Sequence, residues 1–383
     1  MELKEIREKI DCIDDKIVQL FVDRMNLAGE VAKNKIETGK MVSDSTREDE
    51  IIYRLASKTP DELKYYIKEL YSTMFAVSKS LQNKIVNTNS ETVEQIKNAL
   101  NIDDKSFPVS ATVACQGVNG ANSGVAAKRV FPISEISYFK TFEGVFSAVD
   151  KGLCEFGILP IENSTAGSVL EVYDLMNRYN FYITKAIRVK INHCLAVIPG
   201  ADKKDIKKVY SHNQALKQCV EYIKTQKFEG IEVENTAVAA KSVLEGQDKT
   251  VAAICSKECA SIYGLKIIDE NIEDNSSNFT RFIVISKKLN IYKGNDKISI
   301  MTSASHEVGS LSKLLLRFSA LGLNLSKIES RPIVGSDFEF LFYFDFDGNI
   351  EDAGVLNLIA EMENGSIRFK FLGSYKEIIW NIV

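Results

Sequence analysis

The sequence predicts a multidomain protein with an all-helical first part, an α/β middle part and a smaller α+β last part. The chain has 383 residues, which exceeds the length that one hydrophobic core usually organises, so two or three domains are expected. Residues 1–86 carry a helical periodicity and a single proline, whereas short β-rich runs alternate with helices from residue 108 onward. We therefore place domains at 1–86, 108–287 and 296–383, and a linker at 87–107.

Composition and charge exclude several classes of protein. The net charge of -4 gives no polycationic surface for nucleic acid or acidic lipid, and the N-terminus lacks the apolar core of a signal peptide. The seven cysteines form no CxxC pair, and the three histidines are too far apart for a metal-binding pair. We therefore expect a cytoplasmic protein with no nucleic-acid partner, no membrane partner, no disulfide framework and no metal site.

The first domain begins with a long amphipathic helix. Apolar residues recur at alternating spacings of three and four, which predicts a coiled-coil-like seam: Leu3, Ile6, Ile10, Ile13, Ile17, Leu20, Leu27 and Val31. A second helix is expected from about 44 to 57, and a third after Pro60. Three helices with one long seam make a poor self-contained core, so we expect a second chain to cover the seam in a homodimer or homotetramer.

A charged residue interrupts this seam. Arg24 stands where an apolar residue is due, and a charge that faces a core needs a partner or an anionic ligand. Lys35 follows eleven residues later on nearly the same face, roughly 16 Å away. Arg7 lies seventeen residues before Arg24, roughly 25 Å along the helix and about 100° around it. A shared ligand would therefore need Arg7 from a second chain.

These residues resemble the all-helical class of chorismate mutases. The family pattern is matched at Arg7 in "IREKI" and at Arg24, Lys35, Asp44, Arg47, Glu48, Ser78 and Gln82. The resemblance implies that the partner's copy of the first arginine, with Arg24, Arg47 and Ser78, binds the carboxylates of chorismate. Lys35 and Gln82 would donate to the ether oxygen, and Glu48 with the Asp44 region would accept from the ring hydroxyl. For any single residue, an interhelical contact that fixes register is an equal alternative.

Three polar clusters in the middle domain stand at the ends of apolar strands: "GILPIENSTAGSV", "VYSHNQALKQC" and "NFTRF". Open α/β sheets place ligand sites at strand ends. Taken singly, each cluster is also explained as loop capping, with Asn163 and Ser164 as turn residues and Ser211 as a helix N-cap.

Together the three clusters resemble prephenate dehydratase, and "QGVNGANS" and "HCL" extend the match over about residues 109–285. The resemblance implies two α/β lobes with a cleft between them, like periplasmic binding proteins. It implies Thr280 at the reacting hydroxyl, Arg281 on a carboxylate and Phe282 against the ring, with Glu162, Asn163, Ser211 and Gln218 completing the site. No metal or organic cofactor is required.

The last domain reads strand, helix, two strands, helix and strand, which is the order of a split βαβ sandwich. The stretches "HEVGSLSKLL" and "KIESRP" resemble the phenylalanine-binding ACT domain. The resemblance implies that L-phenylalanine binds and inhibits the dehydratase at Gly309, Ser310, Leu311, Glu329, Ser330, Arg331 and Pro332.

These resemblances imply a bifunctional enzyme that converts chorismate to prephenate and then to phenylpyruvate. One rival is a dehydratase whose helical segment serves only for dimerisation, although the complete set of charged residues argues against it. Another is a non-catalytic sensor of a small acid. The acceptance of arogenate and the channelling of prephenate stay open.

Overall fold

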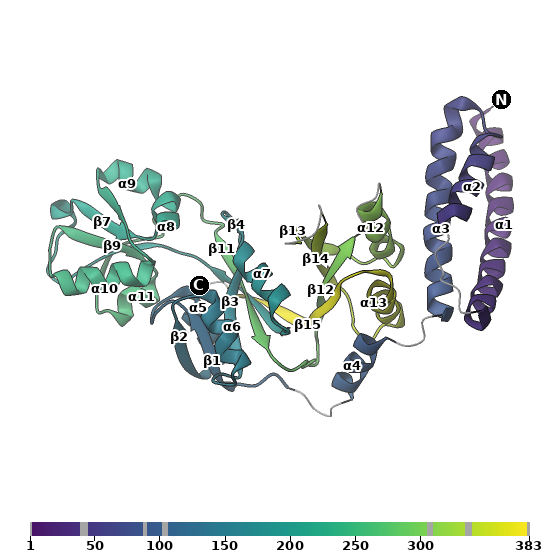
Figure 1. The fold of residues 1–383 in the computed structure, drawn as a ribbon. Coiled ribbons are helices and arrows are strands. Elements are labelled where there is room, and N and C mark those ends of the chain that lie inside the picture. The colour runs from purple at the N-terminus through teal and green to yellow at the C-terminus, as the bar shows by residue number, and fades with distance from the viewer. Residues whose placement is uncertain are drawn as a thin grey trace. The chain divides into compact units, whose positions relative to one another are not determined.

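A computed structural model describes residues 2–38, 45–86, 90–101, 106–304, 309–333 and 339–380 (Figure 1). The chain divides into two compact units. Unit 1 holds residues 1–95, 301–344 and 351–370, and unit 2 holds residues 96–300, 345–350 and 371–383. Within the described residues, no helix is both long enough and apolar enough to cross a membrane.

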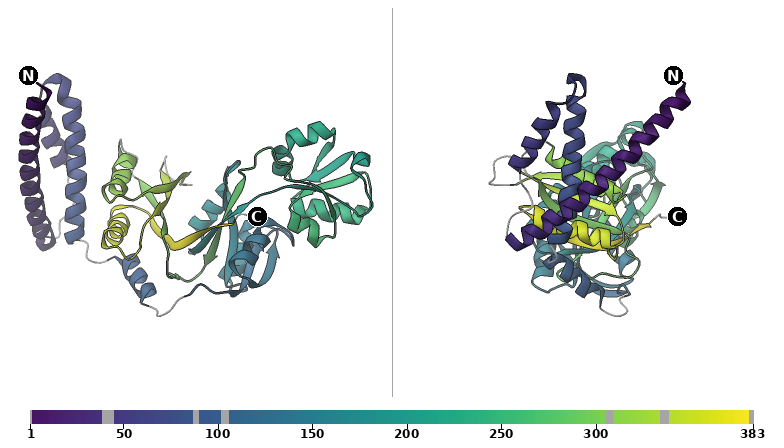
Figure 2. Two further views of the ribbon diagram at one scale, coloured as in Figure 1. Left: turned by 180° about the vertical axis from the view of Figure 1, so that it is seen from behind. Right: turned by 90° about the vertical axis from the view of Figure 1, so that its right-hand side faces the viewer.

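Unit 1 begins with the predicted helices, and the all-helical prediction is confirmed. Helix α1 contacts α3 and crosses it at an angle (Figure 2, right), while α2 packs on α3. A short 3-10 helix over Asp61–Leu63 precedes α3. The helices are α1 (Leu3–Thr38), α2 (Ser45–Ala56) and α3 (Lys64–Val86).

The face of α1 that contacts α3 differs from the predicted seam. Ala28 and Ala32 on α1 are buried, as is Phe75 on α3. The eight seam residues named above are each at least 40% exposed. Small alanine side chains let the two helices approach closely, so the chain buries a narrow face and leaves its larger apolar seam uncovered.

The predicted linker at 87–107 contains a helix. Helix α4 (Glu91–Leu100) is amphipathic, with Val93, Ile96 and Ala99 buried. Its N-terminus is held by Glu363, whose carboxylate accepts hydrogen bonds from the Thr92 backbone N–H (3.2 Å) and hydroxyl (2.5 Å). Most residues of this segment are acidic or polar, but its few apolar residues are regularly spaced and form a short apolar face.

Unit 2 contains two α/β lobes, which confirms the predicted class. In the first lobe the sheet order is β15-β5-β11-β3-β1-β2, with β4 on β3, and helices α5, α6 and α7 pack on it. Its strands are β1 (Ser110–Gln116), β2 (Ile133–Phe139), β3 (Phe156–Asn163), β4 (Gly167–Ser168), β5 (Tyr182–Lys190) and β11 (Phe279–Ser286). Its helices are α5 (Asn122–Val130), α6 (Phe142–Asp150) and α7 (Leu170–Arg178).

The second lobe has a five-stranded sheet of order β10-β6-β9-β7-β8. Its buried apolar residues form a core of their own. The strands are β6 (Cys194–Val197), β7 (Lys208–Ser211), β8 (Glu229–Glu232), β9 (Val251–Cys255) and β10 (Lys266–Glu270). The helices are α8 (Asn213–Gln218), α9 (Val220–Gln226), α10 (Thr236–Gly246) and α11 (Lys257–Ile262), with a 3-10 turn at Lys203–Asp205.

The chain passes between the lobes twice. It leaves the first lobe after β5, through residues 191–193, and returns to β11 through residues 271–278. Strand β11 then inserts between β3 and β5, antiparallel to both. Both connections therefore meet the first lobe at neighbouring strands of one sheet.

The C-terminal segment has the predicted order of elements, and its strands lie in the order β13-β14-β12-β15. This is the strand arrangement of a split βαβ sandwich. Strand β15 continues beyond it and pairs in parallel with β5 in unit 2, with Glu377 opposite Ala186. The elements are β12 (Lys297–Ala304), α12 (Ser310–Ala320), β13 (Leu325–Pro332), β14 (Phe340–Asp347), α13 (Ala353–Gly365) and β15 (Phe369–Trp380).

Candidate active sites

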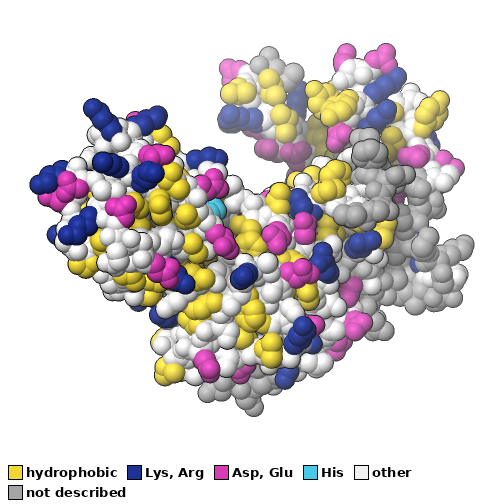
Figure 3. All heavy atoms as spheres, turned by 60° about the vertical axis from the view of Figure 1, so that its left-hand side comes forward, with side chains coloured by type: hydrophobic (Ala, Val, Ile, Leu, Met, Phe, Trp, Pro, Cys, Tyr) yellow, Lys and Arg dark blue, Asp and Glu magenta, His cyan; other side chains and the backbone are white. Residues whose placement is uncertain are grey.

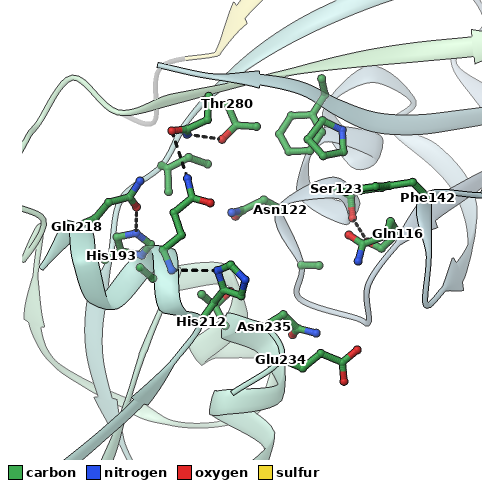
Figure 4. A pocket seen from close by; sticks show the side chains of 18 residues that line it. Gln116, Asn122, Ser123, Phe142, His193, His212, Gln218, Glu234, Asn235 and Thr280 are labelled. Atoms are coloured by element: carbon green, nitrogen blue, oxygen red, sulfur yellow. Dashed lines mark hydrogen bonds between the residues drawn. The ribbon is translucent and has the colours of Figure 1, made fainter. Parts of the chain in front are cut away.

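A pocket of about 290 Å³ lies between the two lobes of unit 2 (Figure 4). Its residues follow the carboxyl ends of strands from both lobes, where open α/β sheets bind ligands. In Figure 4, Gln116, Ser123 and Phe142 face His193, Gln218 and Thr280 across it. The other lining residues are Ala121, Asn122, Pro160, Asn163, Ile191, His212, Gln214, Ala215, Glu234, Asn235, Thr236 and Phe282.

Thr280 and Asn163 form the polar centre of one wall. The Asn163 side chain donates from Nδ2 to Thr280 Oγ1 at 3.0 Å and to Asn278 Oδ1 at 2.9 Å. Asn163 Oδ1 in turn accepts from the Thr165 and Ala166 backbone N–H groups. The amide is therefore held at both ends, and the Thr280 hydroxyl keeps its own proton for donation elsewhere.

A histidine and a glutamine form a second polar pair in the wall. His193 Nε2 donates to Gln218 Oε1 at 2.9 Å, and Gln218 Nε2 donates to Thr165 Oγ1 at 3.0 Å. Burial lowers the pKa of His193, against the smaller raising effects of Gln218 and Glu273. The imidazole is therefore neutral at pH 7. Its buried Nδ1 has no hydrogen-bond partner within the part of the chain that the structure describes.

Among the described residues, no Lys or Arg side chain lines the pocket. Positive potential comes instead from the N-termini of helices α5 and α10, because Asn122, Ser123 and Thr236 are their first residues. Helix α5 has Ala121 as its N-cap, which offers no capping side chain. Its first backbone N–H groups are therefore available to an anion.

Four predicted residues line this pocket, namely Asn163, Gln218, Thr280 and Phe282. Ser211 does not, because it is the last residue of β7, fully buried, and its hydroxyl donates to the Ile254 carbonyl oxygen. It is not a helix N-cap either, since His212 caps α8 by accepting from the Gln214 N–H. Glu162 lies beside Ser168 and Arg281 in the sheet and does not line the pocket.

Arg281 points away from the pocket into a buried cluster. Its guanidinium contacts Asp345 and Glu377 at 2.5 Å each and donates to the Tyr375 hydroxyl at 2.9 Å. In the structure, Arg281 therefore contacts two carboxylates of the protein. The family resemblance implied that it would instead contact a carboxylate of the substrate.

Sequence reasoning missed several lining residues, including His212, Gln214, Glu234 and Asn235. Two of them, His212 and Gln214, belong to the stretch "SHNQALKQC" and could have been found there. A strand that ends at Ser211 turns the residues after it into the cleft, so the polar letters following the strand were better candidates than the serine at its end. Asn122 also lines the pocket.

In unit 1 the structure brings four of the predicted mutase residues to one side of the α1 and α3 pair. Lys35 Nζ lies 3.4 Å from Gln82 Oε1, and Gln82 Nε2 lies 3.4 Å from Ser78 Oγ. Ser78 and Gln82 are buried. Arg24 lies 5.4 Å from the ring of Phe75, and its buried Nη1 has no hydrogen-bond partner among the described residues.

Three other predicted mutase residues, Arg7, Arg47 and Glu48, lie elsewhere on α1 and on α2. Arg7 is exposed on the N-terminal part of α1. Arg47 forms an exposed ion pair with Glu50 at 3.0 Å. Glu48 forms an ion pair with Lys79 at 2.7 Å. Asp44 lies outside the described residues.

The predicted regulatory residues occupy the expected elements of unit 1. Gly309 is the N-cap of α12 and has a φ of 81°. This left-handed conformation favours glycine, and Ser310 and Leu311 follow it in the first turn. Glu329 lies within β13, 3.6 Å from Lys327, and Ser330, Arg331 and Pro332 end that strand.

The buried His193 predicts how the stability of unit 2 depends on pH. Because its folded pKa lies below the unfolded value of about 6.5, the unfolded chain binds more protons between these two values. The free energy of unfolding should therefore fall as pH drops below about 6.5, by at most about 1.4 kcal/mol per pH unit. Urea denaturation followed by fluorescence of the single tryptophan, Trp380, measures this fall.

The replacement His193→Gln should remove this component of the pH dependence. His212→Gln, which removes another imidazole from the same pocket, is the matched control. Equal pH dependence in wild type and His193→Gln would contradict the assigned environment.

Comparison with known proteins supports both family resemblances. The model of the chorismate mutase type II family matches residues 6–83, and that of the prephenate dehydratase family matches residues 113–290. A bifunctional chorismate mutase/prephenate dehydratase of Escherichia coli is 30% identical over 382 residues, which cover 97% of this chain and 96% of that protein. Arogenate dehydratase/prephenate dehydratase 1 of Arabidopsis thaliana is 37% identical over 279 residues, 69% of this chain and 71% of that protein.

Solved structures give the same result for the second half of the chain. The crystal structure of prephenate dehydratase from Arthrobacter aurescens in complex with L-Phe has 29% sequence identity and a TM-score of 0.64. The match covers 69% of this chain and 89% of that structure. Because the relationship to the Escherichia coli protein extends over nearly the whole length of both chains, this chain belongs to the family of bifunctional chorismate mutase/prephenate dehydratases.

Proposed function

We propose that this chain makes phenylpyruvate from chorismate in two steps of L-phenylalanine biosynthesis. The helical segment rearranges chorismate to prephenate, and the pocket between the lobes of unit 2 removes carbon dioxide and water from prephenate. The observation that carries the second assignment is the hydrogen bond between Thr280 and Asn163 in the pocket wall. Formation of phenylpyruvate from chorismate by the purified chain, without added cofactor, tests the proposal as a whole.

The dehydration needs a hydrogen-bond donor at the departing hydroxyl. The bond between the ring and its carboxylate breaks, its electron pair enters the ring, and the hydroxyl leaves and takes up a proton to form water. Because Asn163 donates to Thr280 Oγ1, the threonine proton is free to point at that hydroxyl. An unperturbed threonine is a weak acid, so its role is to orient and stabilise the departing group.

The pocket binds the two carboxylates of prephenate without lysine or arginine. The uncapped N-terminus of α5 offers backbone N–H groups at Asn122 and Ser123, and such groups bind anions well. Gln214 and Gln218 add side-chain donors. Phe282 and Phe142 line the same pocket and provide apolar surface for the ring.

The helical segment supplies an incomplete set of mutase residues from one chain. The reaction is a unimolecular rearrangement, so the protein must hold one conformer and stabilise charge on the ether oxygen. Lys35 and Gln82 are close enough to donate to one oxygen, and the unpartnered Nη1 of Arg24 suits a carboxylate. The exposed apolar seam of α1 supports a homodimer in which the partner's N-terminal arginine completes the site.

The C-terminal segment is the proposed regulatory module, an ACT domain that binds L-phenylalanine. Gly309 and the first turn of α12 would receive the carboxylate, and Glu329 would receive the ammonium group. The left-handed Gly309 leaves open space where a side chain would start, which lets a ligand approach the backbone. A homodimeric or homotetrameric assembly and a cytoplasmic location complete the proposal.

Replacement of Thr280 tests the dehydratase site. Thr280→Ala should lower phenylpyruvate formation from prephenate by about two orders of magnitude or more, as expected when a donor to the departing group is lost. Thr280→Ser, which keeps the hydroxyl, should retain much of the rate. Prephenate should accumulate when Thr280→Ala is supplied with chorismate, and unchanged phenylpyruvate output would refute the role of Thr280.

Replacement of Lys35 or Gln82 tests the mutase site. Lys35→Ala and Gln82→Ala should each lower the conversion of chorismate to prephenate by about two orders of magnitude, because each removes a donor to the ether oxygen. Dehydration of added prephenate should persist. Lys33→Ala is the matched control, since Lys33 is exposed on the same helix and pairs only with Glu30 in the described structure. Equal loss in all three variants would contradict the assignment.

Replacement of Glu329 tests the regulatory site. Glu329→Gln should raise the L-phenylalanine concentration for half-inhibition about tenfold or more, because it removes a charge-assisted hydrogen bond to the ammonium group. Calorimetric titration with L-phenylalanine should show the same loss of affinity. Glu351→Gln, at an exposed site of the same module, is the control. Inhibition of Glu329→Gln at the wild-type concentration would place the effector elsewhere.

A further inference from the structure

We propose that Arg281 is a positioning residue that links the strand bearing Thr280 to the C-terminal module. The link is a cluster of Arg188, Arg281, Ser299, Asp345, Tyr375 and Glu377, whose side chains are buried except for that of Arg188, which is 43% exposed. This inference rests on the proposed dehydratase function. It assigns to the cluster two effects on that reaction: it holds Thr280 in place, and it transmits the state of the module to the pocket.

The cluster, which we call the Arg281 cluster, is compact and hydrogen-bonded throughout. Arg281 Nη1 contacts Asp345 Oδ2 and Arg281 Nε contacts Glu377 Oε1, both at 2.5 Å. Arg281 Nη2 donates to Tyr375 Oη at 2.9 Å. Ser299 Oγ lies 2.5 Å from Asp345 Oδ1 and 2.7 Å from Tyr375 Oη. Each nitrogen of the guanidinium thus has a side-chain partner, namely Glu377, Asp345 or Tyr375.

The charges of the Arg281 cluster balance. Arg281 lies directly opposite Arg188 of β5 in the antiparallel sheet, an arrangement of like charges that is unfavourable alone. Glu377 offsets this repulsion because it pairs with both arginines. Its Oε2 contacts Arg188 Nη2 at 2.7 Å, and its Oε1 contacts Arg281. Two arginines therefore face two carboxylates, and the loss of either carboxylate leaves an uncompensated positive charge on β11.

Strand geometry connects this cluster to the reaction. Successive side chains of a strand point to opposite faces, and Thr280 and Phe282 line the pocket while Arg281 between them points into the cluster. A β-bulge shifts the pairing with β3 between Arg281 and Phe282. Because a bulge interrupts the ladder, this end of β11 is held less firmly on its β3 side, whereas its ladder with β5 is regular from Phe279 to Val284. The ion pairs of Arg281 fix the orientation that the ladder with β3 leaves open.

The same contacts argue against a direct role for Arg281 in binding substrate. Its side chain is 8% exposed, and it does not line the pocket. Its three partners Asp345, Tyr375 and Glu377 come from β14 and β15 of the C-terminal segment. A shift of these strands when the effector binds would therefore move Arg281, and with it the adjacent Thr280.

Two substitutions that remove charge with little change of shape test the inference in the full-length protein. Asp345→Asn and Glu377→Gln should each lower kcat for dehydration of prephenate by about tenfold or more, as expected when a reacting group is misplaced. KM should change by less than about twofold, since the anion-binding groups stay in place. The L-phenylalanine concentration for half-inhibition should rise by about fivefold or more, because the link is weakened.

Control variants separate this role from simple loss of stability. Asp347→Asn removes a carboxylate two residues further along β14 that pairs with Lys297 at 2.8 Å and does not touch Arg281. It should keep wild-type kcat and L-phenylalanine response. Ser299→Ala and Tyr375→Phe, which keep every charge, should shift kcat and inhibition in the same direction by smaller factors. Urea denaturation followed by the fluorescence of Trp380, which belongs to unit 2, reports whether each variant is folded.

Different results overturn different statements. Asp345→Asn and Glu377→Gln with wild-type kcat and inhibition, and only a lower unfolding midpoint, would show that the cluster is merely structural. A raised KM with unchanged kcat in Arg281→Lys would show that Arg281 binds the substrate directly. A wild-type protein that forms no phenylpyruvate from prephenate would overturn the proposed function, and this inference with it.

Discussion

The position of strand β11 is the constraint on which the rest of unit 2 depends. It pairs with β3 on one side and β5 on the other, and its residues from Phe282 to Ser286 are all buried. The chain returns to it directly from the second lobe. One end of this strand therefore carries a pocket residue on one face and the Arg281 ion pairs on the other. A displacement of the strand end cannot affect one of these without the other.

Among the described residues, the pocket is lined by the N-termini of two helices and by no cationic side chain. A buried lysine or arginine in so small a space would need a counter-charge whenever the pocket is empty, whereas backbone N–H groups at a helix N-terminus carry only partial charge. In the proposed function, these N–H groups receive the carboxylates of the substrate, and Arg281, next to Thr280 in the chain, is neutralised by Asp345 and Glu377. On the face in Figure 3, positive and negative side chains are interspersed.

The sequence predicted the domain classes and several residues that line the pocket, for physical reasons that also explain the errors. Alternating β-rich and helical runs identify an α/β fold, whereas β2, β8 and β10 have mostly half-buried or exposed side chains and therefore no long apolar run. Asn163 ends β3 and Thr280 lies at the start of β11, so both stand at the ends of apolar strands and within the stretches that carry the family resemblance. The environment of Arg281 could not, since Asp345 and Glu377 lie 64 and 96 residues further along the chain.

Helix α1 divides its surface between two tasks. Arg24, Ala28, Ala32 and Lys35 follow one another at spacings of four, four and three, so they share a stripe, and this stripe faces α3 and Gln82. The larger apolar side chains lie on the uncovered seam. The separation means that the stripe facing α3 keeps its shape without the seam being covered. In the proposed homodimer, a second chain on the seam delivers the N-terminal arginine, whereas α3 already positions Lys35 and Gln82.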